Sequence, residues 1–107
     1  MTTFTDERGS IRNIGHASII ESKAGSVRSN HYHKAGWHYL YVVSGAMRYK
    51  EKDAPGGTVI LDRLVEPGQM VHTGPNAPHR TEFLEDTVMI SLQSEHAHDE
   101  DLVRVEW

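Results

Sequence analysis

The stretch that decides the fold runs from residue 25 to residue 45 and reads Gly25-Ser-Val-Arg-Ser-Asn-His31-Tyr-His33-Lys-Ala-Gly-Trp-His38-Tyr-Leu-Tyr-Val-Val-Ser-Gly45. His31 and His33 are two residues apart, so both imidazoles project from the same face of an extended strand. His38 follows after a glycine-containing turn, and an apolar run rich in β-forming residues comes next. Imidazoles are common ligands of transition metals. The stretch therefore predicts part of a metal site built on neighbouring strands.

Outward from this stretch, turn signals recur about every 8–12 residues, the spacing typical of all-β sandwiches and barrels. No segment keeps a helical apolar stripe for three turns, so little helix is expected. The predicted strands cover residues 10–14, 17–21, 25–33, 37–43, 46–50, 58–65, 69–73, 80–84 and 87–92, and residues 102–107 are expected to add an edge strand. Ile60, Leu64 and Val65 are the core candidates of the strand 58–65. A length of 107 residues predicts one domain, 1–107.

Composition narrows the class of protein. The formal net charge of -4 provides no basic surface for nucleic acid, and no apolar run reaches the roughly 20 residues of a membrane helix. The N-terminus is polar and acidic and lacks the apolar segment of a secretory signal, so a cytoplasmic location is expected. The chain has no cysteine, which leaves His, Asp and Glu as metal ligands. A mean hydropathy of -0.54 indicates a modest core, which favours a homodimer.

The other part of the metal site should come from a later strand, because a barrel brings distant strands together. His79 is the candidate, since it stands between the loop 74–78 and the predicted strand 80–84. Pro75 and Pro78 stiffen that loop and so restrict where the His79 side chain points, as a metal ligand requires.

These spacings resemble the two sequence motifs of the cupin superfamily. The first motif is matched by Gly25, His31, His33, position 38 and Gly45, and the second, more degenerate, by Gly68, Gly74, Asn76 and His79. In the second motif Gly74 replaces the usual proline, Asn76 the usual glycine, and Phe83 an expected asparagine. The resemblance implies an all-β, single-domain cupin, which is a double-stranded β-helix or jelly-roll barrel. It also implies a dimer formed through the N-terminal strands.

The most informative departure from the family pattern is His38, because most cupins carry a glutamate ligand there. Some metal-binding cupins tolerate this exchange, so the resemblance implies a four-histidine site of His31, His33, His38 and His79. A neutral imidazole in place of a carboxylate favours Zn, Ni, Fe or Cu over Mn or Mg. The expected cofactor is one divalent transition metal, with Zn, Ni, Fe and Mn as the candidates. The alternative is a barrel without metal, in which His38 marks the loss of the carboxylate.

Strand parity predicts which side chains share a face with these histidines. Val27 and Ser29 are expected beside His31 and His33, Leu40 and Val42 beside His38, Thr81 and Phe83 beside His79, and Met89, Ser91 and Gln93 together on a late strand. The cavity wall is therefore expected to be mixed apolar with a few hydroxyl groups.

Other residues are candidates for contacts with a small-molecule substrate. Arg28, Phe83 and Gln93 are the substrate-binding candidates, and Arg48 shares with Arg28 the alternative of a surface charge. His72 is a candidate catalytic base, with a structural histidine as the alternative. His96 and His98 repeat the His-x-His spacing in an acidic segment and either bind a second ion or lie in a solvated loop.

Residues 8–14 and 27–34 also look like small cupins of sugar-nucleotide metabolism, including the dTDP-sugar ketoisomerases, in which such histidines act as acid and base. Three hypotheses for the function follow. The first is a metal-dependent enzyme with isomerase, epimerase or lyase chemistry on a sugar-like or keto-acid metabolite. The second is an Fe- or Ni-dependent dioxygenase. The third is a non-catalytic, metal-stabilised cupin that binds a small ligand.

Overall fold

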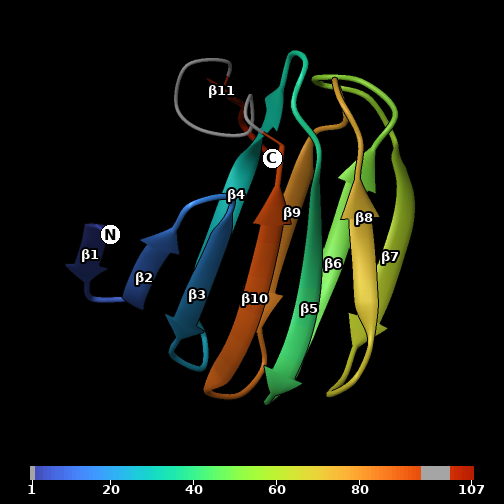
Figure 1. The fold of residues 1–107 in the computed structure, drawn as a ribbon. Coiled ribbons are helices and arrows are strands. Elements are labelled where there is room, and N and C mark those ends of the chain that lie inside the picture. Colours follow the sequence, from blue (N-terminus) through green and yellow to red (C-terminus); the bar gives the residue numbers. More distant parts are fainter. Residues whose placement is uncertain (1, 95–101) are drawn as a thin grey trace.

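A computed structural model describes residues 2–94 and 102–107 of the chain and shows an all-β fold (Figure 1). Its strands are β1 (Thr2–Asp6), β2 (Gly9–Ile14), β3 (Ala17–Ser22), β4 (Val27–His33), β5 (His38–Ser44), β6 (Met47–Lys52), β7 (Val59–Val65), β8 (Met70–Thr73), β9 (His79–Phe83), β10 (Thr87–Gln93) and β11 (Leu102–Arg104). These described residues contain no helix, and hence none with the length and apolar character needed to cross a membrane.

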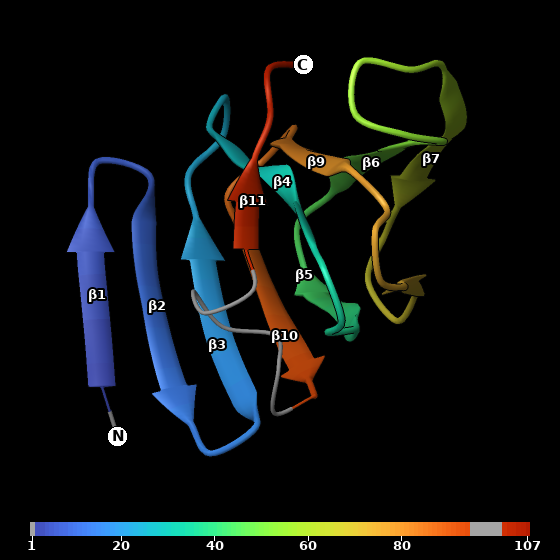
Figure 2. The same cartoon turned by 90° about the horizontal axis from the view of Figure 1, so that it is seen from above.

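The strands form two antiparallel sheets that face each other (Figure 2). One sheet has the order β1-β2-β3-β10-β5-β8, and the other has the order β11-β4-β9-β6-β7. Strands distant in sequence are neighbours in both sheets, as in β3 with β10 and β4 with β9. This arrangement confirms the predicted jelly-roll barrel.

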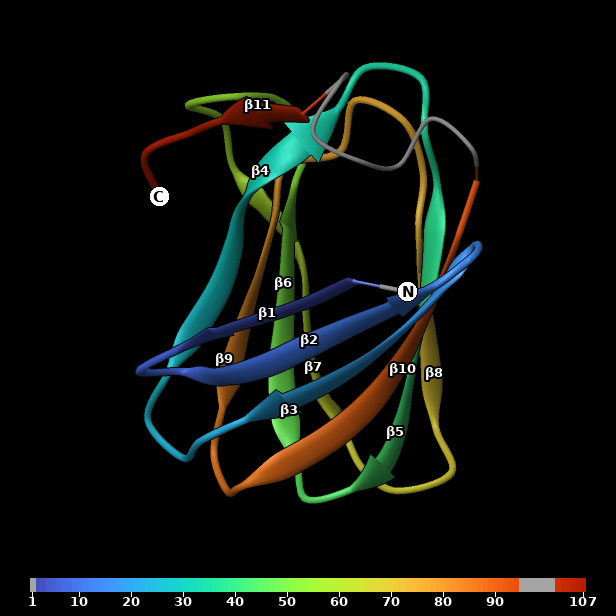
Figure 3. The same cartoon turned by 60° about the vertical axis from the view of Figure 1, so that its left-hand side comes forward.

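Of the two terminal strands, the C-terminal one was predicted from the sequence and the N-terminal one was not. Residues 102–104 form β11, which pairs with the outer edge of β4 and confirms the predicted edge strand. Strand β1 was not predicted, because its sequence Thr-Thr-Phe-Thr-Asp has little apolar alternation. It forms because all five residues pair with β2, and Figure 3 shows the resulting hairpin extending the sheet beyond β3.

The hydrophobic core lies between the sheets and consists of Ile20, Leu40, Val42, Met47, Tyr49, Val65, Val71, Phe83 and Met89. Val65 is fully buried, as predicted. The same prediction is wrong for Ile60 and Leu64, whose exposed fractions are 61% and 41%. Both lie on β7, which is the edge strand of its sheet and is covered only near Val65. An apolar run marks a strand but does not show which of its residues another layer covers.

Candidate metal centre

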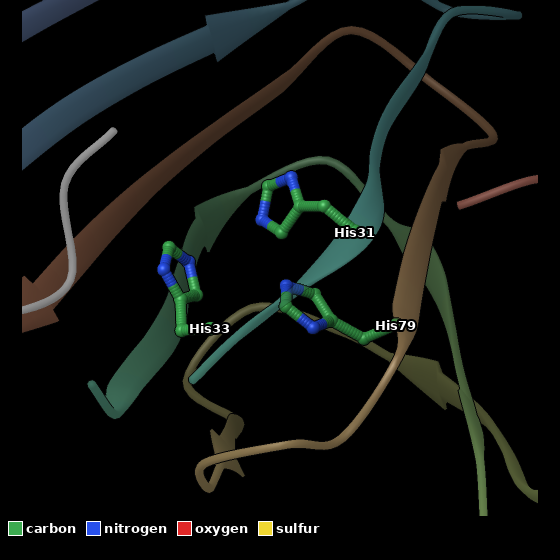
Figure 4. A group of neighbouring side chains, drawn as sticks. All are labelled: His31, His33 and His79. Carbon is green, nitrogen blue, oxygen red and sulfur yellow. The ribbon is translucent and has the colours of Figure 1, made fainter. Parts of the chain in front are cut away.

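Three of the predicted ligands come together between the sheets. His31 and His79 are direct cross-strand partners on β4 and β9, and His33 lies two residues further along β4. One nitrogen from each ring can be chosen so that all three lie within 4.8 Å of one another. Figure 4 shows the three rings gathered in one space. The fold thus brings His79 next to two histidines that lie more than forty residues earlier in the sequence.

A backbone hydrogen bond orients His79. Its Nδ1 lies 2.9 Å from the carbonyl oxygen of Ala77, so Nδ1 carries the proton and donates it to that oxygen. The other nitrogen, Nε2, is then a lone-pair donor. It is buried and has no hydrogen-bond partner among the described residues. This is the arrangement by which metal-ligating histidines are usually held in position.

Other buried nitrogens of the cluster are also without hydrogen-bond partners in the described part of the chain. They are both ring nitrogens of His31 and Nε2 of His38. An unpaired buried polar atom costs roughly 1–3 kcal/mol, so several in one place call for an explanation. A bound metal ion would satisfy one nitrogen of each ring that it contacts, and the donor set therefore fits a transition metal.

The electrostatics keep these imidazoles neutral. Burial, with smaller contributions from His79 and His33, lowers the pKa of His31 to about 2. Burial lowers the pKa of His79 to about 4, and it lowers the pKa of His38 well below its usual value, with the neighbouring histidines adding to the effect. Each group is therefore a lone-pair donor at neutral pH, as metal ligation requires.

His38 lies against the three-histidine cluster from the opposite sheet. It is buried on β5, and its ring centroid lies 5.0 Å from that of His79 and 5.5 Å from that of His33. It is not one of the three residues whose nitrogens lie within 4.8 Å of one another. The structure thus places His38 next to the cluster but outside its set of three neighbouring nitrogens.

His31, His33 and His38 border a cavity of about 420 Å³, within the usual size range of small-molecule sites. Its wall mixes apolar and polar side chains from both sheets, as predicted, and includes Leu40, Met89, Ser91 and Gln93. Ser18 links two of the polar groups, because it accepts a hydrogen bond from Gln93 Nε2 and donates one to Asn13 Oδ1. The shared face of Met89, Ser91 and Gln93 is confirmed.

Arg28 also lines this cavity, which strand parity did not predict. A β-bulge interrupts the β4–β9 pairing between Ser29 and His31, and Ser29 and Asn30 have φ values of 77° and 52°. The extra residue moves Arg28 to the face of His31, opposite the buried Thr81. The assignment of Val27 to that face is therefore wrong, whereas Ser29 reaches the cavity at the bulge.

Three other candidates lie elsewhere. His72 is exposed on the outer face of β8, with its ring centroid 4.7 Å from that of Tyr39, and it does not line the cavity, which favours the structural alternative. Phe83 shares the face of His79 as predicted but packs in the hydrophobic core rather than on the cavity wall. Arg48 is exposed and forms an ion pair with Asp62. His96 and His98 lie outside the described residues.

Sequence reasoning missed two further arginines of the cavity wall. Arg8 comes from the β1–β2 turn and Arg104 from β11, beside His31. Both lie on elements whose position in the fold the spacing of the two motifs does not predict. The only sequence signal was the alternation in residues 102–107, which predicted an edge strand but not the strand it pairs with.

The chain matches a known family along most of its length. A family model described as the ChrR Cupin-like domain matches residues 8–98. Among curated proteins none matches the chain in sequence.

Solved structures share the fold. The capsular polysaccharide assembling protein CapF from Staphylococcus aureus superposes with a TM-score of 0.85 at 24% identity, over 99% of this chain but 32% of CapF. KdgF from Halomonas gives a TM-score of 0.70 at 21% identity, over 85% of this chain and 81% of KdgF. A 3,4-ketoisomerase from Helicobacter canadensis gives 0.73 at 17% identity, over 96% and 85% of the two chains. This chain spans about a third of the length of CapF, and at these identities the likeness concerns the fold.

Proposed function

This chain belongs to the ChrR cupin-like domain family, and from that premise we propose that it is a metal-binding cupin and a small-molecule enzyme. Its centre binds one divalent transition metal, Zn, Ni, Fe or Mn, through His31, His33 and His79, with His38 as the fourth ligand. The reaction is of the isomerase, epimerase or lyase type, on a sugar-like or keto-acid metabolite.

One observation carries the proposal. Neutral imidazoles from both sheets carry buried nitrogens that have no hydrogen-bond partner within the described residues, and two of these residues, His31 and His38, line a 420 Å³ cavity. A purely structural histidine cluster would pair these nitrogens with carbonyl or hydroxyl groups, as His79 Nδ1 is paired with Ala77. A divalent metal bound there would supply Lewis-acid polarisation of a carbonyl or enediol oxygen.

The protein's own side chains supply orientation and exclusion of water. The polar chain of Asn13, Ser18 and Gln93 faces the cavity from the sheet opposite β4 and offers hydrogen bonds to substrate hydroxyl groups. Leu40 and Met89 belong to the apolar part of the wall, which reduces access of water. With His72 on the outer face, His38 Nε2 is the candidate to accept a proton if His38 is not a ligand.

Two structural neighbours support the reaction class, since one is named a 3,4-ketoisomerase and another a dTDP-4-dehydrorhamnose 3,5-epimerase, from Sulfolobus tokodaii. The epimerase acts on a sugar nucleotide by name, and a related substrate is a proposal for this chain and not a property of the fold. Assembly as a homodimer and a cytoplasmic location stay predictions, and sedimentation analysis and cell fractionation would test them.

Elemental analysis of three purified variants tests the metal proposal. The wild type is expected to hold about one transition ion per chain after dialysis. His79→Gln should lose the ion, because it removes a donor at the centre of the cluster. His72→Gln is the matched control and should keep it, because His72 is exposed on the outer face. His38→Gln separates the two roles of that residue, since a base leaves metal content unchanged and a ligand does not.

Two results would contradict the metal proposal. One is a folded wild type that takes up no transition ion when dialysed against each of the four candidates. The other is an equal loss of metal from His72→Gln and His79→Gln.

A further inference from the structure

The cavity wall indicates the chemical class of the substrate. We propose that Arg28 binds an oxyanion, a carboxylate or a phosphate group, so that the substrate of the proposed enzyme is an anionic metabolite. The statement that this anion is a substrate rests on the proposed function. The binding of an anion by Arg28 does not depend on it.

Arg28 is a largely buried cation that is not in direct contact with a described carboxylate. Its residue is only 6% exposed, and among the described residues no ion pair involves it. Its Nε donates to Ser22 Oγ at 2.8 Å and its Nη2 donates to the Glu21 carbonyl oxygen at 3.4 Å. A guanidinium has five N–H donors. Both N–H groups of Nη1 and one of Nη2 therefore have no hydrogen-bond acceptor among the described residues. These donors form a fork that matches two oxygens of a carboxylate or phosphate.

A buried charge without a counterion is costly, so something must offset it. Burial and the nearby charge of Arg8 lower the pKa of Arg28, and the charge of Asp6 offsets only part of this lowering. Arg8 is itself paired with Asp6, and this carboxylate is thereby engaged by another guanidinium. Asp6 is thus shared between Arg8 and Arg28, and an incoming anion would add a second negative charge beside these two guanidinium groups.

The charged side chains of the cavity wall also favour an anionic ligand. The described residues that line the cavity include Arg8, Arg28 and Arg104 but no aspartate or glutamate. This is unexpected for a chain with a formal net charge of -4. A cavity bordered by charges of one sign concentrates ligands of the opposite sign. The wall of the cavity is therefore positively charged, although the chain as a whole carries a net negative charge.

The β4 bulge links this cation to the metal centre. Because of the bulge, Arg28 and His31 lie on the same face of one strand and border the same cavity. Non-glycine residues with φ values in the left-handed region, such as Ser29, are uncommon and concentrate at functional sites. An oxyanion held by Arg28 would place the remainder of a small molecule beside the imidazole cluster.

Thermal unfolding of the metal-free protein, prepared with a chelator, tests the anion site directly. The probes are malonate, inorganic phosphate and neutral malonamide at constant ionic strength and neutral pH. Malonate or phosphate should raise the unfolding midpoint of the wild type in a saturable manner, and malonamide should not. The anion with the larger shift identifies the group as carboxylate or phosphate.

Two substitutions and a control complete the test. Arg28→Gln should abolish the shift, and Arg28→Lys should weaken anion affinity about tenfold, because an ammonium group cannot make the two-pronged contact. Arg48→Gln should respond like the wild type, since Arg48 is exposed and paired with Asp62. The proposal is overturned if neither anion shifts the wild type, or if Arg28→Gln and Arg28→Lys both bind as tightly as the wild type. Because the protein is metal-free, a failure of the metal proposal leaves this response intact.

Discussion

At the residue scale, His79 shows how one hydrogen bond prepares an imidazole for a metal. The Ala77 carbonyl oxygen accepts the hydrogen bond from Nδ1, which leaves the buried Nε2 as the lone-pair donor of the ring. The motif spacing predicted that His31, His33 and His79 would approach one another, because it encodes the positions of two paired strands. It did not predict the acceptor for Nδ1, since that depends on the path of the backbone through the loop 74–78.

Acid should destabilise the metal-free protein. Burial depresses the pKa values of His31, His38 and His79 in the folded state, whereas the same groups in the unfolded chain have pKa values near 6.5. Below that pH the unfolded state binds more protons, so the free energy of unfolding falls as pH falls. Each such histidine contributes up to about 1.4 kcal/mol per pH unit. Urea denaturation between pH 6.5 and about 5, above the range in which most carboxylates titrate, measures the slope.

The wild type saturated with metal is the comparison for this measurement. Its stability should be higher throughout, because the ion binds only the folded state. A metal-free protein whose free energy of unfolding does not change between pH 6.5 and about 5 would contradict the neutral, buried cluster.

At the element scale, strand β4 was predicted correctly from the sequence in one respect and incorrectly in another. The His-x-His spacing correctly predicted that His31 and His33 share a face of an extended strand. The same parity rule failed for Arg28, because the bulge between Ser29 and His31 adds one residue to β4 but none to β9. Nothing in Ser29 or Asn30 alone signals a bulge, since both residue types also occur in regular strands. The position of Arg28, and with it the charge of the cavity, therefore required the structure.

The turn between β5 and β6 has a glycine that the fold requires. Gly45 has a φ of 89°, and a Cβ atom there would lie 2.4 Å from the backbone oxygen of Asp86. Gly45→Ala should therefore destabilise the protein by about 2–4 kcal/mol, from the left-handed backbone and the collision with β10. Gly56→Ala is the matched control, because Gly56 has a φ of 72° but its Cβ position has no neighbouring atom within 4 Å among residues 2–94 and 102–107.

The control should cost only the backbone strain, about 1 kcal/mol. Denaturant unfolding of both variants measures the difference between them. Equal destabilisation of the two variants would show that the packing of Gly45 against Asp86 does not matter, contrary to the structure.

At the scale of the whole molecule, the site exists because two sheets meet. One sheet provides His31, His33 and His79, and the other provides His38 and the polar chain that includes Gln93. The jelly-roll fold could be predicted from turn spacing and the two motifs, since both reflect the order of strands. The three arginines of the cavity could not, because Arg8 and Arg104 lie on the first hairpin and the last strand, whose neighbours the motifs do not specify.

The central claim is that the imidazole cluster is a metal centre, and an anomalous diffraction map of a crystal of the metal-loaded protein tests it most directly. The account predicts one strong peak per chain, about 2.0–2.1 Å from a nitrogen of each of His31, His33 and His79. A fourth contact to His38 would establish the four-histidine set. A map with no peak at this cluster, or with its peak at other residues, would contradict the account.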